Sequence, residues 1–139
     1  MLAFFLALTV AGSNLIFLHD DPAADQAIRR CMQATYALDL STARHEAEGL
    51  QIRFPDHPAG YMLMTETYWW EALADPGNKS IESAFYRAQE TALKKAENAL
   101  KLNKYPTIEV TADLASAYGT YARFQFTQGK SCGALSAPP

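Results

Sequence analysis

Residues 43–68 read ARHEAEGLQIRFPDHPAGYMLMTETY, and this stretch decides the fold that the sequence predicts. Its first part places Ala43, Ala47 and Leu50 at the three- and four-residue spacing that brings side chains onto one face of an α-helix. Two prolines then interrupt the pattern, because proline disfavours helical geometry in the residue before it and cannot continue a helix interior. A second helical run follows Pro58, so the stretch predicts two helices joined by a short turn.

The same helical periodicity continues on both sides of this stretch, and no segment alternates as a strand would. Clusters of turn-forming residues separate the helical runs, and Gly129 is suited to end the last one. The predicted fold is therefore all-α, with about five helices paired as antiparallel hairpins after an N-terminal apolar leader. The helices are expected over residues 24–36, 41–54, 58–74, 80–103 and 107–128.

The composition fits one folded domain without a basic surface. The chain has 139 residues, of which 49% are hydrophobic and 19% are charged, so it can bury a core and is not intrinsically disordered. Lys and Arg together number 12 and Asp and Glu number 15, which gives a formal net charge of -3. Nucleic-acid-binding domains normally carry a basic patch. This charge balance therefore argues against a nucleic-acid partner.

Self-similar spacing within the chain resembles the tetratricopeptide repeat family. The family pattern is W-x2-L-G-x2-Y on a first helix, then A-x3-F on a second helix and a terminal proline, with a period of about 34 residues. Here a second helix, its terminal proline and the next first helix follow one another at the family's spacing. The matching residues are Ala43-x3-Ala47, Pro55 and Tyr61-x2-Met64-Thr65-x2-Tyr68.

Two later segments extend the resemblance, which covers roughly residues 24–135. Another second helix and another first helix match after a hairpin that is lengthened in both helices. These segments are Ala92-x3-Ala96 and Leu114-Ala115-x2-Tyr118. Small residues replace the family's glycine where helices cross, at Cys31, Thr65 and Ala115. The resemblance implies stacked helix hairpins, as in an α-solenoid, and a divergent, exported bacterial member with a truncated array.

In this family the first helices of successive hairpins line a concave groove that binds extended peptides. The resemblance thus implies a non-catalytic scaffold that binds a protein or peptide partner. Methionine gives adaptable apolar contact, and an exposed tryptophan is a common anchor in interfaces. The implied groove residues are Met32, Tyr36, Met62, Glu66, Trp69, Ser116 and Arg123. An alternative interpretation places Trp69 and Trp70 in the core of a thick helix pair.

A second function stays open, because Tyr61, Tyr68 and Trp69 could instead line a pocket for a small molecule, with Glu66 or Arg123 as a polar anchor. No catalytic constellation stands out beside these residues. The three histidines are scattered, and they fit solvated or helix-capping positions better than a metal site. We therefore expect no enzymatic activity, no metal and no cofactor.

The N-terminal residues 1–19 begin with an uncharged, strongly apolar run of signal-peptide length, followed by small residues. They are interpreted as an export signal, with a buried first helix or an uncleaved membrane anchor as alternatives. We expect residues 20–23 to be a linker, residues 24–135 to form the repeat domain and residues 136–139 to be a tail. A cleaved signal would place the protein in the periplasm or outside the cell, and its absence would leave it in the cytoplasm.

Two further features bear on assembly. Cys31 and Cys132 lie far apart in the sequence and outside any metal-ligand spacing, so both a pair of unrelated thiols and a disulfide in an exported chain stay open. Gly129 and Ala134-Leu135 resemble the family's turn and the start of another second helix, and the pattern stops there, where that helix would pack. A terminal hairpin without a cap exposes an apolar face. Self-association through this C-terminal end is therefore a further hypothesis.

Overall fold

The computed structural model describes residues 17–129, which form one short 3₁₀ helix and five α-helices. Within these residues there is no strand, so the all-α class is confirmed. The observed helix bounds differ from the expected ones by no more than two residues. The elements are η1 (Leu18–Asp20), α1 (Pro22–Tyr36), α2 (Leu40–Arg53), α3 (Ala59–Ala74), α4 (Lys79–Leu102) and α5 (Thr107–Thr127).

Side-chain caps and left-handed residues define the helix ends. Asp21 begins α1 by accepting hydrogen bonds from the backbone N–H groups of Ala23 and Ala24, both at 3.0 Å. Asp39 caps α2 in the same way. After α5, Gly129 has a φ of 70°, which glycine adopts without the steric cost that a Cβ brings. The expected end of the last helix at Gly129 is confirmed.

Residues 20–23 depart from the expected linker, because they belong to the packed structure. They complete η1 and begin α1. Leu18, two residues before this segment, is buried, and its backbone N–H donates to both carboxylate oxygens of Glu109 on α5, at 3.0 and 3.2 Å. This bond and the Asp21 cap fix the chain where a linker was expected.

The structure does not describe residues 1–16 and 130–139. The last residues of the expected repeat domain, the tail at 136–139 and all of the apolar leader except residues 17–19 lie there. The leader and the tail stay predictions from the sequence. Among the helices of residues 17–129, none combines the length and the apolar character needed to cross a membrane.

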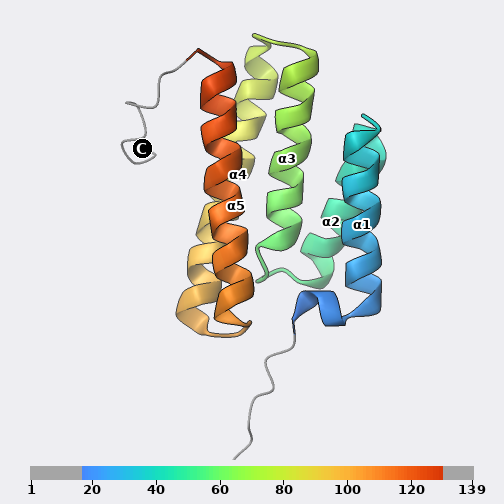
Figure 1. Ribbon diagram of the computed structural model, residues 1–139, viewed down its shortest axis with the longest axis vertical. Coiled ribbons are helices and arrows are strands. Elements are labelled where there is room, and N and C mark those ends of the chain that lie inside the picture. Colours follow the sequence, from blue (N-terminus) through green and yellow to red (C-terminus); the bar gives the residue numbers. More distant parts are fainter. Residues whose placement is uncertain (1–16, 130–139) are drawn as a thin grey trace, which may run out of the picture.

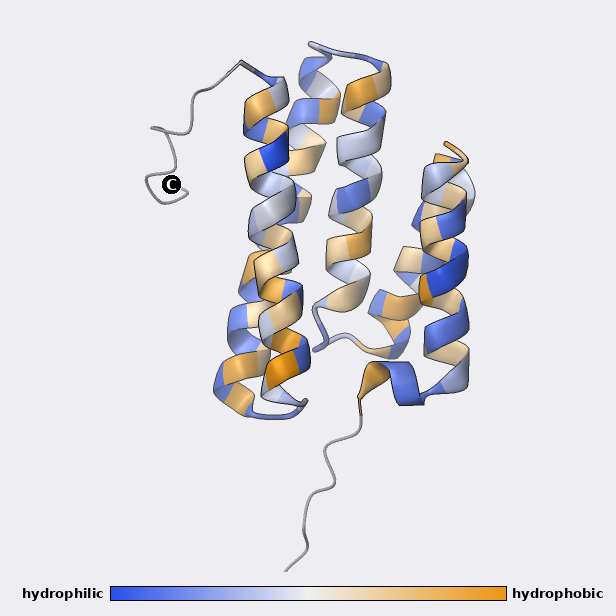
Figure 2. Cartoon of the chain, viewed as in Figure 1, coloured by the Kyte–Doolittle hydropathy of each residue, from blue (hydrophilic) through white to orange (hydrophobic). Residues whose placement is uncertain are grey.

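The helices are arranged in two layers (Figure 1). Each helix packs against the next one along the chain and runs in the opposite direction, and α3 also contacts both α1 and α5. The odd-numbered helices α1, α3 and α5 therefore lie side by side in one layer, with α2 and α4 behind them. Hydrophilic and hydrophobic residues both occur along every helix (Figure 2), and the two kinds are separated most clearly onto different faces in α1 and α4.

Small side chains bring α1 and α2 together. Cys31, Ala43 and Ala47 are fully buried in one cluster, and the Cys31 thiol donates to the Ala43 carbonyl oxygen at a sulfur–oxygen distance of 3.2 Å. Burial raises the pKa of the Cys31 thiol to about 11, so it is protonated at neutral pH. The other cysteine, Cys132, lies outside the described residues.

The contact between α2 and α3 is closer still, and it depends on Gly60. A Cβ at position 60 would lie 2.9 Å from the backbone N of Gln51 and 3.0 Å from the backbone O of Ala47. The Gln51 side-chain amide donates to the Gly60 carbonyl oxygen at 3.1 Å. Backbone therefore lies directly against backbone where the first helix pair meets the second.

Aromatic rings hold the second half of the molecule together. The rings of Phe85 on α4 and Phe124 on α5 are stacked with centroids 3.8 Å apart, and both side chains are fully buried. Ala72 of α3 completes this cluster. Buried aromatic surface of this kind contributes most of the stabilisation of a small helical core. The cluster fixes α5 beside α3, which positions the surface described next.

Substituting alanine for Gly60 tests the α2–α3 contact. The added methyl group has no free volume, because rigid backbone atoms surround it, so we expect Gly60→Ala to lower the free energy of unfolding by about 1–3 kcal/mol. Urea unfolding followed by circular dichroism measures this. Gly49→Ala is the matched control, since nothing lies within 4 Å of a Cβ there, and alanine should stabilise α2 by about 0.5–1 kcal/mol. Equal stability of both variants would contradict the contact.

Candidate functional site

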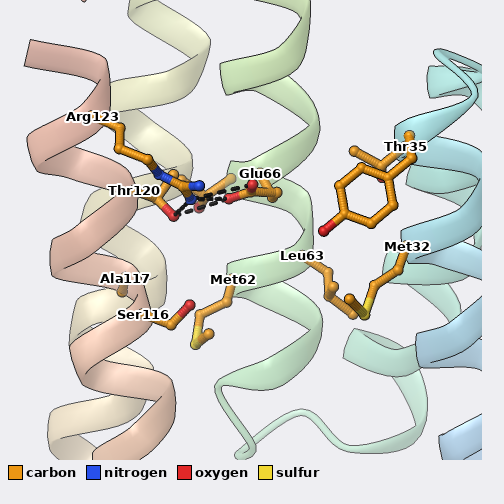
Figure 3. A pocket seen from close by; sticks show the side chains of 11 residues that line it. Met32, Thr35, Met62, Leu63, Glu66, Ser116, Ala117, Thr120 and Arg123 are labelled. Carbon is orange, nitrogen blue, oxygen red and sulfur yellow. Dashed lines mark hydrogen bonds and ion pairs between the residues drawn. The ribbon is translucent and has the colours of Figure 1, made fainter. Parts of the chain in front are cut away.

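A cavity of about 360 Å³ lies between the three helices of the front layer. Its walls come from α1, α3 and α5, which are far apart in the sequence (Figure 3). The lining residues are Met32, Thr35, Tyr36, Met62, Leu63, Thr65, Glu66, Ser116, Ala117, Thr120 and Arg123. All of the implied groove residues except Trp69 are among them. We call this surface the front groove.

The apolar walls of the front groove are open to solvent. Met32 is 41% exposed and Tyr36 is 63% exposed, both on α1. Two half-buried residues of α3 face the two sides of the hollow, with Leu63 toward Met32 of α1 and Met62 toward Ser116 of α5 (Figure 3). Single exposed apolar residues are normal on a protein surface, but these gather around one hollow. The arrangement can accept an apolar group without any rearrangement of the helices.

A polar network closes the groove between α3 and α5. The Arg123 guanidinium donates through Nη2 to both carboxylate oxygens of Glu66, at 3.2 and 3.0 Å, and to the Thr120 hydroxyl oxygen at 2.8 Å. The Thr120 hydroxyl in turn donates to Glu66 at 2.9 Å (Figure 3). Within residues 17–129, the Arg123 Nε and Nη1 groups make no hydrogen bond, so they can donate to a ligand.

Trp69 supports the front groove from beneath without lining it. Its ring lies under the guanidinium of Arg123, with Cζ 4.4 Å from the ring centroid. It packs with the Ala72, Phe85 and Phe124 cluster, so the core interpretation describes its place better than the groove interpretation. The neighbouring Trp70 meets Tyr36 edge-on at 5.8 Å.

A second cavity, of about 270 Å³, lies between α2, α3 and α4 on another side of α3. Tyr61 and Tyr68 line it together with Arg87, whereas Trp69 lines neither cavity. Each tyrosine ring also faces a cation, Lys95 at 4.9 Å from Tyr61 and Arg44 at 4.3 Å from Tyr68. The three aromatic residues that could have formed one small-molecule pocket are therefore divided between different surfaces.

A buried ionisable cluster, which sequence patterns did not predict, lies where the α2–α3 turn packs against the start of α5. His57, in the α2–α3 turn, is only 1% exposed and caps α3 by accepting from the Ala59 N–H at 3.2 Å. Its Nε2 atom is 3.6 Å from a Glu109 carboxylate oxygen, and its Nδ1 atom is 3.8 Å from an Asp113 oxygen. The ring of Tyr105 packs edge-on against the imidazole at 4.5 Å.

Burial shifts the proton equilibria of this cluster in opposite directions. It lowers the pKa of His57, because the imidazolium loses its hydration, although Glu109 partly opposes the shift. Burial also raises the pKa of Asp113 to about 7, and the Glu109 carboxylate adds to this rise. The burial of Asp113 could have been predicted from its position in the sequence, because it falls between Val110 and the buried Ala117 on the core side of α5.

The other two histidines lie at the surface, and His19 pairs with Asp25 at 3.2 Å. Among residues 17–129, no group of three or more His, Cys, Asp or Glu side chains could hold a metal ion.

Comparisons of the chain with protein-family models, with curated proteins and with solved structures gave no match.

The raised pKa of Asp113 predicts a pH-dependent stability. The native state holds this proton up to about pH 7, whereas the unfolded chain releases it near pH 4, so the free energy of unfolding falls as pH rises between these values. The slope from this one group is at most about 1.4 kcal/mol per pH unit. Asp113→Asn should remove that slope and stabilise the protein above pH 7, in urea titrations from pH 4 to 8.

Two points complete this experiment. The lowered pKa of His57 acts in the opposite sense, because it lowers the free energy of unfolding as pH falls below about 6.5. The wild type and Asp113→Asn both contain His57, so this effect is present in both proteins. Glu97→Gln, at an exposed position of α4, controls for the loss of one negative charge. The same pH slope in Asp113→Asn and in the wild type would show that Asp113 ionises freely in the native protein.

Proposed function

We propose that this protein is a tetratricopeptide-like scaffold without catalytic activity, which binds an extended peptide segment of a partner protein in the front groove. The packing supports the proposal, because consecutive helices form antiparallel pairs and the first helix of each pair contacts the next first helix. Repeat proteins of this kind present the surface of those first helices to their ligands.

One observation carries the proposal more than any other. The family resemblance implied seven groove residues, and six of them line one cavity: Met32 and Tyr36 on α1, Met62 and Glu66 on α3, and Ser116 and Arg123 on α5. Residues with no common role would scatter over all sides of three helices. The convergence supports the repeat register and the groove together.

The chemistry of the front groove suits a peptide. Met32 and Met62 are flexible and polarisable, so they can adapt to different apolar side chains. The Nε and Nη1 groups of Arg123, which make no hydrogen bond to residues 17–129, can donate to backbone carbonyl oxygens, which every extended peptide presents. Glu66 already holds one end of the guanidinium, so Arg123 is oriented before a ligand arrives.

A small-molecule ligand fits this surface less well. Pockets for small ligands usually bury most of the ligand surface. Here Tyr36 is mostly exposed and the Arg123 side chain is 50% exposed, so the groove encloses little. A ligand that extends along three helices gains more contact than one that stays in the hollow. We therefore favour the peptide over the small molecule.

The test is selection of peptides from a random phage-displayed library on the folded wild-type protein, followed by affinity measurements with variants. Met32→Ala and Met62→Ala lie on different helices of the groove, and we expect each to weaken binding of selected peptides roughly five- to tenfold by calorimetry. Thermal unfolding checks that each variant remains folded.

Ile52→Ala is the matched control for that experiment, because Ile52 is an exposed apolar residue on α2, outside both cavities. It should bind like the wild type. Peptides that bind both groove variants as tightly as the wild type, or that lose affinity only with Ile52→Ala, would show that the front groove is not the binding site.

A further inference from the structure

One line of residues on the outward side of α5 is apolar along the length of the helix. Six residues recur at steps of four, three, four, three and four, which places them in one line on the helix: Ile108, Ala112, Ala115, Gly119, Ala122 and Phe126. Ile108 is 73% exposed and Phe126 is 77% exposed, although both are large apolar residues. We call this line of residues the α5 seam.

The α5 seam lies opposite the face by which α5 joins the core. The core side carries Val110, Ala117, Thr120 and Phe124, all buried. A surface helix normally turns charged residues to solvent on the side away from its core. The neighbouring helix α4 does so, with Glu90, Lys94, Glu97 and Lys101 exposed. The α5 seam holds no charged residue, so it has the character of a packing surface.

The order of residue sizes along the seam points to a helix as its occupant. Small residues at the centre, Ala115 and Gly119, let a second helix approach closely, as the small residues Cys31 and Ala43 do between α1 and α2. Two packed helices cross at an angle and diverge away from the crossing point. The large side chains of Ile108 and Phe126 stand at the ends, where this widening gap must be filled.

The same order of residue sizes fits a second copy of α5. The spacing of the α5 seam is identical in both chain directions, because the steps of four and three residues form a palindrome. When a second α5 lies antiparallel across the first, Ile108 meets Phe126 at each end, Ala112 meets Ala122, and Ala115 meets Gly119. A two-fold axis near position 117 relates the two helices, and such isologous contacts are the commonest form of dimer.

We propose that the α5 seam is the interface of a homodimer, in which two copies of this chain pack their α5 helices antiparallel about a two-fold axis. Burying two lines of apolar residues over a helix of 21 residues, about 32 Å long, removes them from water on both copies at once. No residue of the α5 seam lines the front groove, so the dimer can be tested separately from the proposed peptide binding.

Charge substitutions at the two ends of the seam test both the dimer and its direction. The wild-type protein should sediment as a dimer at micromolar concentration in analytical ultracentrifugation. Ile108→Lys and Phe126→Glu should each be monomeric, since each places two unpaired charges against apolar side chains and weakens the dimer roughly a hundredfold or more. Circular dichroism should show unchanged helix content, because both side chains are exposed.

An equimolar mixture of these two variants gives the decisive result. In an antiparallel heterodimer, Lys at 108 in one copy faces Glu at 126 in the other, and the opposite end keeps the original Ile108–Phe126 contact. We therefore expect the mixture to sediment as a dimer although each variant alone does not. Within one copy the two positions are about 27 Å apart along the helix, so they cannot compensate each other intramolecularly.

Three results would overturn the proposal. One is a wild-type protein that sediments as a monomer up to high micromolar concentration. Another is a dimer that survives both single substitutions, which would place the interface elsewhere. The third is a mixture that stays monomeric, which would exclude the antiparallel arrangement. Ile52→Lys, at an exposed apolar position of α2, is the matched control and should sediment like the wild type.

Discussion

The close contact between the backbones of α2 and α3 at Gly60 is the constraint on which the rest of the structure depends. It joins the first helix pair to the second, and no side chain separates the two helices at that point. The position of α3 beside α1 follows from this contact, and the front groove lies between them and α5. Glycine is required there for space, because any Cβ would meet rigid backbone atoms.

Polar residues between the helices add a second level of organisation. Glu66, Thr120 and Arg123 tie α3 to α5 at the surface, and His57 with Glu109 and Asp113 ties the α2–α3 turn to the start of α5. Exposed ion pairs contribute little to stability, whereas buried ionisable groups make stability depend on pH. The first network therefore serves mainly to orient Arg123, while the second couples the packing at the base of the molecule to proton binding.

The helices and most of the groove could be predicted because both follow from local spacing. Proline and glycine mark the helix ends, and the helical spacing within each segment is compatible with the place of Met32, Met62 and Ser116 around one cavity. Trp69 shows where register is insufficient. A large side chain at the edge of a helix face can turn toward the groove or toward the core. Trp69 turns toward the core, where it packs with the Phe85–Phe124 pair from other helices. That choice depends on residues that no local pattern includes.

The sequence by itself determined that the chain is helical, where each helix of residues 17–129 begins and ends to within two residues, and which side of α1, α3 and α5 carries Met32, Met62 and Arg123. Helical periodicity and proline are local properties, so they can be read from neighbouring residues. Only the tertiary structure decided that Leu18 binds Glu109, that His57 is buried beside Asp113, and that Tyr61 and Trp69 face different surfaces. Those outcomes depend on contacts between residues far apart in the chain, which form only when the helices pack.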